Sequence, residues 1–274
     1  MSRELREKVR ALVADEVTLG DAPNDGPERV ALVYPSPYRT GMSSLGFLQI
    51  HRLIQSRGRV SERAFLPEDP DEYRRTNTSL FTFENERPVR SFPAVLLSVA
   101  YEIEIAGMIE VLELAGIPPL AKDRDERHPF ILMGGPLTFS NPLPLAPYAD
   151  TVLMGEADET IHDALDVIFA HVGSTRRAAD WKTEAMRAMA DKIPSAFVPE
   201  LHGDTMPEIA KCAVELLPAF AAIRTPHTEL RDMFLVEAER GCSRGCTYCV
   251  MRRSTNGGMR IVPLQQSTAL IPWA

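Results

Sequence analysis

The sequence predicts an α/β fold in which helices cover both faces of a parallel sheet. Two observations predict it: short apolar runs recur within residues 28–172, and most are followed by apolar residues at helical spacing. Strands buried on both faces are continuously apolar, and parallel neighbours need a crossover connection, usually a helix. Residues 28–172 therefore fit one flavodoxin-like, doubly wound domain.

The predicted elements follow one another in a regular order. Residues 1–27 hold a short amphipathic helix and a loop. The domain then has five strands, at residues 30–34, 60–65, 94–99, 130–133 and 151–154, and three helices, at residues 43–57, 102–115 and 159–171. Residues 173–231 form a proline-rich connecting region with one helix near Trp181. Residues 233–239 are then expected to form a strand that leads into a cysteine cluster within the last segment, 232–274.

Composition indicates a globular protein of a reducing compartment. Hydrophobic residues make up 45% and charged residues 25% of the 274 residues. The net charge of −8 does not favour broad binding to nucleic acid or anionic membranes. No apolar run reaches the roughly 18 residues that a membrane span requires, and the first 15 residues are too charged for a signal peptide. We therefore expect a cytoplasmic protein without a membrane partner.

Three of the four cysteines form one local set. Cys242, Cys246 and Cys249 have the spacing Cys-x3-Cys-x2-Cys, and Cys212 lies well upstream. An odd, tightly spaced triplet is no disulfide framework, and thiolates in such a set bind zinc or an iron-sulfur cluster. A closed zinc site needs a fourth ligand, so a zinc site that recruits His227 or Cys212 remains an alternative.

With Tyr248 included, this triplet resembles the signature of the radical S-adenosylmethionine (SAM) enzymes. The resemblance implies that the cysteines bind a 4Fe-4S cluster whose open iron chelates SAM, with Tyr248 near the adenine. An electron from a reductant such as flavodoxin or ferredoxin then cleaves SAM into methionine and a 5′-deoxyadenosyl radical. Gly241 and Gly245 can adopt positive φ and bring backbone N–H groups near the sulfurs, so Gly245 is a cofactor-binding candidate.

Loops at the carboxyl ends of the strands resemble a cobalamin-binding-like domain found in many radical SAM proteins. The matching turns are Gly134-Gly135-Pro136 and residues 155–159. Gly134 and Gly135 are therefore cofactor-binding candidates, although ordinary turn chemistry explains them equally well. Tyr38 stands where histidine-ligated relatives carry the cobalt ligand, so cobalamin is not expected. Nearly the whole chain resembles uncharacterised fused radical SAM proteins of this kind.

The same resemblance makes 233–239 the first strand of a TIM-like barrel. Only 25 residues follow Cys249, whereas a partial barrel needs about 200. We expect a truncated radical SAM domain that cannot turn over alone, with a second polypeptide as a candidate source of the barrel. Arg252, Arg253 and Arg260 are expected to be solvated surface charges.

Two other interpretations of the function of the whole chain remain. The main one is a non-catalytic α/β binding domain whose cysteine tail holds a structural metal. A cobalamin-dependent methyltransferase is disfavoured by Tyr38.

Overall fold

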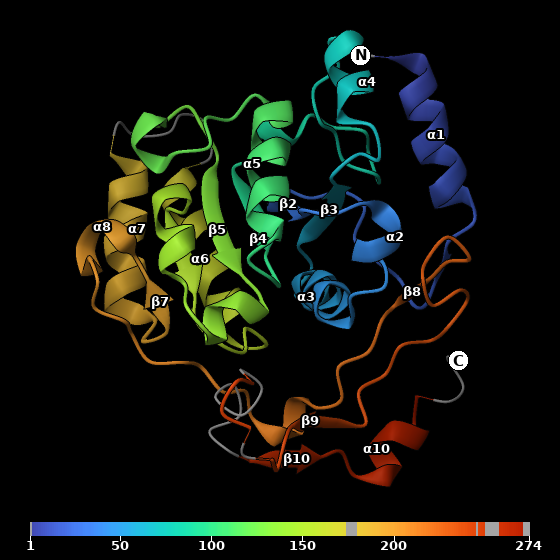
Figure 1. Cartoon of the computed structure of the whole chain (residues 1–274), viewed down its shortest axis with the longest axis vertical. Helices are drawn as coiled ribbons and strands as arrows, with labels where there is room; N and C mark the ends of the chain where they lie inside the picture. Colours follow the sequence, from blue (N-terminus) through green and yellow to red (C-terminus); the bar gives the residue numbers. More distant parts are fainter. Residues whose placement is uncertain (1, 174–179, 245, 250–257, 271–274) are drawn as a thin grey trace.

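The computed structural model describes residues 2–173, 180–244, 246–249 and 258–270. At its centre is a six-stranded sheet (Figure 1). Its strands are β2 (Arg29–Tyr34), β3 (Val60–Phe65), β4 (Ala94–Ser98), β5 (Phe130–Gly134), β6 (Thr151–Leu153) and β7 (Ala196–Phe197). The strand order is β3-β2-β4-β5-β6-β7, and the first five strands are parallel. This is the flavodoxin-like order, so the predicted fold class is confirmed.

Helices cover both faces of the sheet. One face packs against α3 (Leu45–Ser56), α6 (Thr160–Val172) and α7 (Trp181–Lys192), and the other against α1 (Arg3–Ala14), α4 (Pro70–Arg75) and α5 (Glu104–Ala115). Strand β2 shows why both faces are filled. Val30 and Leu32 belong to the core with α3, whereas Ala31 and Val33 belong to the core with α5. Alternate side chains of a strand point to opposite faces, so a continuously apolar strand must be covered twice.

The sheet extends beyond the range 28–172 that the sequence predicted. Strand β7 pairs antiparallel with β6, with Val152 opposite Phe197. Helix α7 buries Trp181 and Met189 in the same core as α6. Part of the expected connecting region therefore belongs to the sheet domain. Its edge strand β7 is only two residues long.

After β7 the chain crosses the carboxyl ends of the parallel strands. It contains α8 (Pro199–His202) and β8 (Ile223–Arg224), which pairs with β1 (Val17–Thr18). Strand β9 (Glu239–Gly241) then pairs antiparallel with β10 (Met259–Ile261), and α10 (Leu264–Thr268) follows. Figure 1 shows this hairpin at the opposite end of the molecule from α4. The remaining helical turns are α2 (Tyr38–Gly41) and 3₁₀ turns at Val89–Ser91, Ala121–Asp123, Pro136–Phe139, Leu143–Tyr148 and Val214–Leu216.

The prediction of a strand at 233–239 is wrong for most of this range. Val236 makes only an isolated bridge with Phe220, and regular pairing begins at Glu239. The apolar run favoured a strand, but it contacts residues 219–221 rather than a parallel neighbour among the described residues. In the described ranges, no helix is long and apolar enough to cross a membrane.

Candidate functional site

The three cysteines of the triplet follow β9 directly. Their side chains are partly buried, whereas Tyr248 is 88% exposed. The Arg244 backbone N–H donates to Cys242 Sγ at 3.4 Å. Gly241 has φ of +103°, as expected for the glycine that precedes the first cysteine. Gly245 lies outside the described residues.

The chemistry of this donor set fits an iron-sulfur cluster with three protein ligands. A tetrahedral zinc site with Zn–S bonds of about 2.3 Å would bring its sulfurs within about 4 Å of one another. Among the described residues, the only three ligating side chains whose donor atoms all lie within 4.8 Å are Glu156, Asp158 and Cys212. His227, the other suggested zinc ligand, bonds instead to Asp15 at 2.6 Å.

Two arginines attach the cysteine-bearing hairpin to the sheet domain. Arg240 on β9 lies opposite Arg260 on β10, so both side chains extend from the same face of the hairpin. They meet Glu156 and Asp158, which lie in the turn after β6. We call these four residues, together with Glu237, the arginine-carboxylate junction.

Arg240 makes the larger share of the contacts in the junction. Its guanidinium donates to both carboxylate oxygens of Glu237, at 2.7 and 2.9 Å, and to Asp158 Oδ2 at 2.8 Å. Burial alone would lower the pKa of Arg240, but the hydrogen bonds to Glu237 and Asp158 outweigh burial and raise this pKa above its usual range. Arg240 therefore stays protonated, and its contacts hold the guanidinium group in one position.

Arg260 was expected to be a solvated surface charge, and this expectation is wrong. Its side chain is 9% exposed, forms an ion pair with Glu156 and donates to the Cys212 carbonyl oxygen at 2.9 Å. Burial is possible because the carboxylate and carbonyl replace water. Arg252 and Arg253 lie outside the described residues. The sequence signal that could have revealed Arg260 is its place in a strand near the cysteine loop, together with the acidic turn at 155–159.

The cluster of Glu156, Asp158 and Cys212 is filled by a guanidinium group. Arg240 Nη1 lies 3.5 Å from Glu156 Oε2, 2.8 Å from Asp158 Oδ2 and 3.0 Å from Cys212 Sγ. Burial raises the pKa of the Cys212 thiol to about 12, and the Asp158 carboxylate adds to the rise. Cys212 is therefore a neutral thiol near neutral pH, and thiols bind metals as thiolates. This cluster is an ion-pair network.

The turn after β6 also binds the segment that follows β7 and crosses the carboxyl ends of the strands. Gly155 has φ of +94°, and a Cβ atom there would lie 2.4 Å from the Ala210 carbonyl oxygen. The neighbouring backbone bonds explain this close approach: Ala210 N–H donates to the Met154 oxygen and Glu156 N–H to the Ala210 oxygen. Glu156 Oε2 also accepts from the Cys212 N–H at 2.9 Å. Gly155 is thus required by backbone packing.

Gly135 has a similar structural reason to be glycine. Its φ is +108°, and a Cβ atom there would lie 2.6 Å from the Val99 carbonyl oxygen. Val99 N–H donates to the Gly134 oxygen at 2.8 Å, continuing the pairing of β4 and β5. Gly134 itself would place a Cβ atom at an ordinary 3.8 Å from the Leu153 oxygen. The packing of two strand ends accounts for Gly135 without a ligand, and cofactor binding by either glycine stays a prediction.

Tyr38 is part of the core. Its ring stacks on Phe83 and meets Phe65 edge-on, with centroid distances of 5.3 and 5.2 Å. Its hydroxyl donates to Glu16 Oε1 at 2.7 Å and lies 3.3 Å from Thr225 Oγ1. Burial raises the pKa of this phenol above its usual range. These contacts give Tyr38 a structural role.

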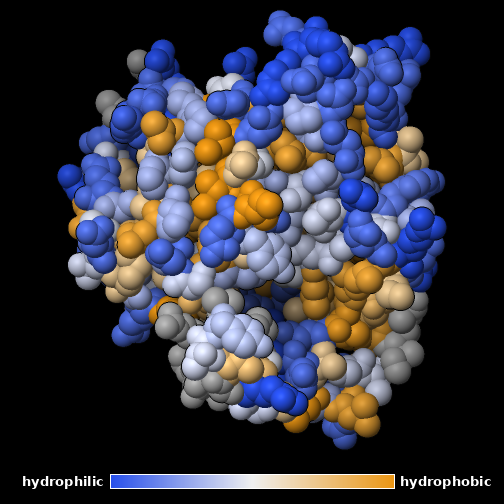
Figure 2. Space-filling model, in the orientation of Figure 1, coloured by the Kyte–Doolittle hydropathy of each residue, from blue (hydrophilic) through white to orange (hydrophobic). Residues whose placement is uncertain are grey.

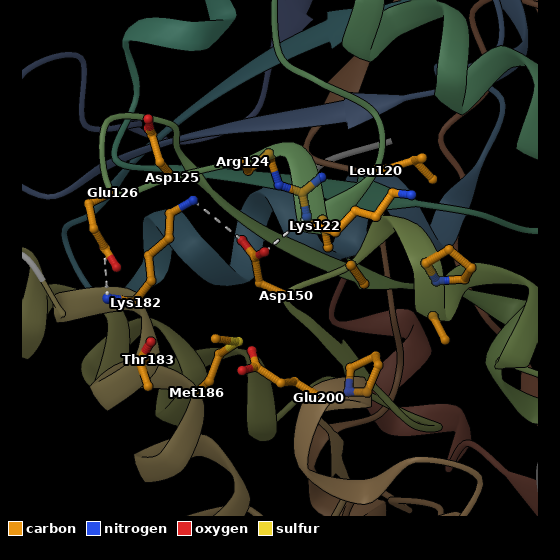
Figure 3. A pocket seen from close by; sticks show the side chains of 15 residues that line it. Leu120, Lys122, Arg124, Asp125, Glu126, Asp150, Lys182, Thr183, Met186 and Glu200 are labelled. Carbon is orange, nitrogen blue, oxygen red and sulfur yellow. Dashed lines mark hydrogen bonds and ion pairs between the residues drawn. The ribbon is translucent and has the colours of Figure 1, made fainter.

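A cavity of 670 Å³, drawn in Figure 3, is lined by none of the junction residues. Its walls come from the segments that precede β5 and β6 and from α7 and α8. Asp150 accepts a hydrogen bond from Arg124 at 2.9 Å and lies 3.8 Å from Lys182 Nζ. These groups stand at the amino ends of the strands, whereas ligands of such sheets bind at the carboxyl ends. The cavity is therefore separate from the cysteine loop.

Comparison with known proteins places this architecture in a family. The family model described as "Radical SAM proteins, N-terminal" matches residues 46–199, more than half of the chain. The chain belongs to this family. The match ends before the cysteine triplet, so the triplet adds a second and independent indication of the radical SAM superfamily.

One curated relative and one solved structure are reported as similar to this radical SAM N-terminal family protein. The uncharacterized protein MJ0966 of Methanocaldococcus jannaschii is 22% identical over 230 residues, which cover 82% of this chain and 41% of the relative. A solved structure of the radical SAM methyltransferase TsrM from Kitasatospora setae, with tryptophan substrate and a SAM analogue bound, has 12% identity and a TM-score of 0.47. That similarity covers 90% of this chain and 46% of TsrM. The chain spans less than half the length of either protein.

Proposed function

We propose that this chain binds a 4Fe-4S cluster through Cys242, Cys246 and Cys249, and SAM at the iron that these cysteines leave open. The observation that carries the proposal is the spacing of the three cysteines, with Tyr248 beside the third, in a chain of the radical SAM N-terminal family. When bound, the cluster supplies the electron that cleaves SAM into methionine and a 5′-deoxyadenosyl radical.

The chain's own residues prepare the loop for this role. The Arg244 backbone N–H donates to Cys242 Sγ at 3.4 Å and helps to orient this side chain. The arginine-carboxylate junction holds the base of the loop against the carboxyl edge of the sheet, where doubly wound domains place their ligands. Tyr248 is exposed and free to cover the adenine of SAM.

We further propose that additional polypeptide, continuous with this chain or separate from it, supplies the rest of the barrel. Most large exposed hydrophobic side chains of the described residues lie after residue 200. Met233, Ile261 and Leu264 are 57%, 66% and 77% exposed, and Figure 2 shows apolar surface around the foot of the molecule. Apolar surface of this kind marks a contact surface. A one-electron reductant such as flavodoxin or ferredoxin is the second proposed partner.

Anaerobic reconstitution with iron and sulfide tests the proposal. We expect about four iron and four sulfide per chain, as a 4Fe-4S cluster requires. Cys246→Ala should lose most of this iron. Cys212→Ala is the matched control and should keep it, because Cys212 is buried outside the loop. With SAM and a reductant, this chain by itself should form little 5′-deoxyadenosine.

Each other outcome has a definite meaning. A colourless protein that binds zinc through the same cysteines would replace the proposal by the alternative, a binding domain with a structural metal. Iron content that does not depend on Cys246 would reject the ligand set. Cysteine-dependent 5′-deoxyadenosine from this chain alone would contradict the need for further polypeptide.

A further inference from the structure

We propose that Glu156 and Asp158 are positioning residues, which hold the cysteine loop in place through Arg240 and Arg260. The two carboxylates belong to the sheet domain and the two arginines to the hairpin that carries the loop. The part of this inference that concerns the cluster rests on the proposed function. The part that concerns the hairpin stands on the contacts of the junction alone.

The hairpin needs an external attachment. Strands β9 and β10 have three residues each, and an isolated two-stranded hairpin is marginal in water. On one face of the hairpin, Glu239 and Ile261 are exposed. Val262, directly after β10, is buried with Cys212 and Leu217 in a small cluster. Apart from this cluster, and from the backbone bond between Glu237 and Ala219 just before β9, the attachments of the hairpin that we find among the described residues are made by its arginines. These are the ion pairs with the carboxylates and the hydrogen bonds to Cys212.

The charges of the hairpin make these ion pairs necessary. Arg240 and Arg260 lie directly opposite each other, and like charges in that arrangement repel. The Arg240 and Arg260 side chains are only 15% and 9% exposed, so water screens this repulsion weakly. Glu156, Asp158 and Glu237 supply three carboxylates around the two guanidinium groups. The hairpin can therefore sit in this place only with its carboxylate partners.

The junction lies at the two ends of the cysteine loop. Arg240 is two residues before Cys242, and Arg260 is on the strand that follows the loop. The partners of Arg240 and Arg260 are held in turn. Gln49 on α3 donates to Asp158 at 3.4 Å, and Glu156 bonds to the Cys212 backbone. The junction therefore holds both ends of the loop in position relative to the rigid sheet.

The first experiment is hydrogen exchange on the cluster-free full chain, comparing Glu156→Gln with Glu239→Gln. Both variants remove one carboxylate, but Glu239 lies on the exposed face of the same hairpin. We expect exchange at 239–241 and 259–262 to rise about tenfold or more in Glu156→Gln, because a buried arginine loses its ionic partner. Glu239→Gln should match the wild type. Unchanged exchange in Glu156→Gln would overturn the inference.

Two further measurements separate positioning from general damage. Exchange in β2 and β4 should stay at the wild-type level, which shows that the sheet still folds. Adding Arg260→Gln to Glu156→Gln removes the uncompensated charge but does not restore the attachment, so it should recover only part of the protection of the hairpin. The inference would also be overturned if the double variant recovers no protection and the sheet is unfolded in both Glu156→Gln and the double variant.

The second arm uses the reconstituted protein. Glu156→Gln should change the electron paramagnetic resonance line shape of the reduced cluster, because its ligands are held less uniformly, while Glu239→Gln should not. A wild-type protein that takes up no cluster would reject the proposed function and leave the exchange result as the test of positioning. A wild-type cluster whose spectrum is identical in Glu156→Gln would reject the positioning role alone.

Discussion

Gly155 joins the sheet to the cysteine-bearing part of the chain through its backbone. It follows β6, has positive φ, and lies against the Ala210 backbone at a distance that leaves no room for a Cβ atom. The next residue, Glu156, binds Arg260 and the Cys212 N–H. Gly155 thus allows the segment around Ala210 to pass close to the turn, and it also sets the position of Glu156 in the junction.

We predict that Gly155→Ala lowers the free energy of unfolding by about 2 kcal/mol or more, through strain and backbone displacement. Gly46→Ala is the control, because Gly46 is in α3 with no atom within 4 Å of the added Cβ. That change should be neutral or stabilise by up to about 1 kcal/mol. Chemical denaturation measures both. Equal effects of the two substitutions would contradict this view of Gly155.

At the residue scale, the sequence suggested candidate ligands more readily than it suggested the residues that hold them in position. The cysteine spacing is local, so Cys242, Cys246 and Cys249 could be proposed without a fold. The role of Arg260 depends on Glu156, which is 104 residues away in the sequence. Such a pairing follows from the fold and not from the local pattern. Gly135 likewise needed the position of Val99 to be understood.

At the scale of elements, the sequence pattern identified the five parallel strands and their helices, because most of them contain apolar runs or apolar residues at helical spacing. Strand β7 was missed because two residues carry no period. The strand at 233–239 was predicted from apolar residues that make only one isolated bridge among the described residues. Short edge elements are decided by tertiary partners, which a local pattern does not contain.

Helix α3 carries a buried histidine with a consequence for pH. His51 Nδ1 lies 2.9 Å from Ser61 Oγ on β3. Burial lowers the pKa of His51 well below its usual value, and the nearby Arg63 charge adds to the effect. The folded protein therefore keeps His51 neutral in a range where the unfolded chain takes up a proton.

We predict that this difference reduces stability as pH falls below about 6.5, by up to about 1.4 kcal/mol per pH unit for the one proton involved. The unfolded state binds more protons there, so the free energy of unfolding decreases toward acid pH. His51→Asn should flatten this slope between pH 6.5 and 5, and denaturation at several pH values measures it. His162, whose pKa burial also lowers, leaves part of the slope in place. Parallel curves for wild type and His51→Asn would rule out His51 as a source.

At the scale of the whole molecule, the chain combines a family domain with a segment that bears the cysteine triplet. The sheet domain is a rigid base, and its carboxyl edge faces the segment that bears the cysteines. Figure 2 shows the surface hollowed between this base and the segment at the foot of the view. The fold class could be predicted from periodicity, whereas the attachment of the two parts became visible only in the ion pairs of the junction.

The most direct test of the central claim is electron paramagnetic resonance of the anaerobically reduced, reconstituted protein with and without SAM. The account predicts a cluster signal that changes when SAM is added, because the amino and carboxylate groups of SAM bind the open iron. The signal should persist in Cys212→Ala and vanish in Cys249→Ala. A signal that SAM leaves unchanged, or one that survives the loss of Cys249, would contradict the claim that this loop holds a cluster open to SAM.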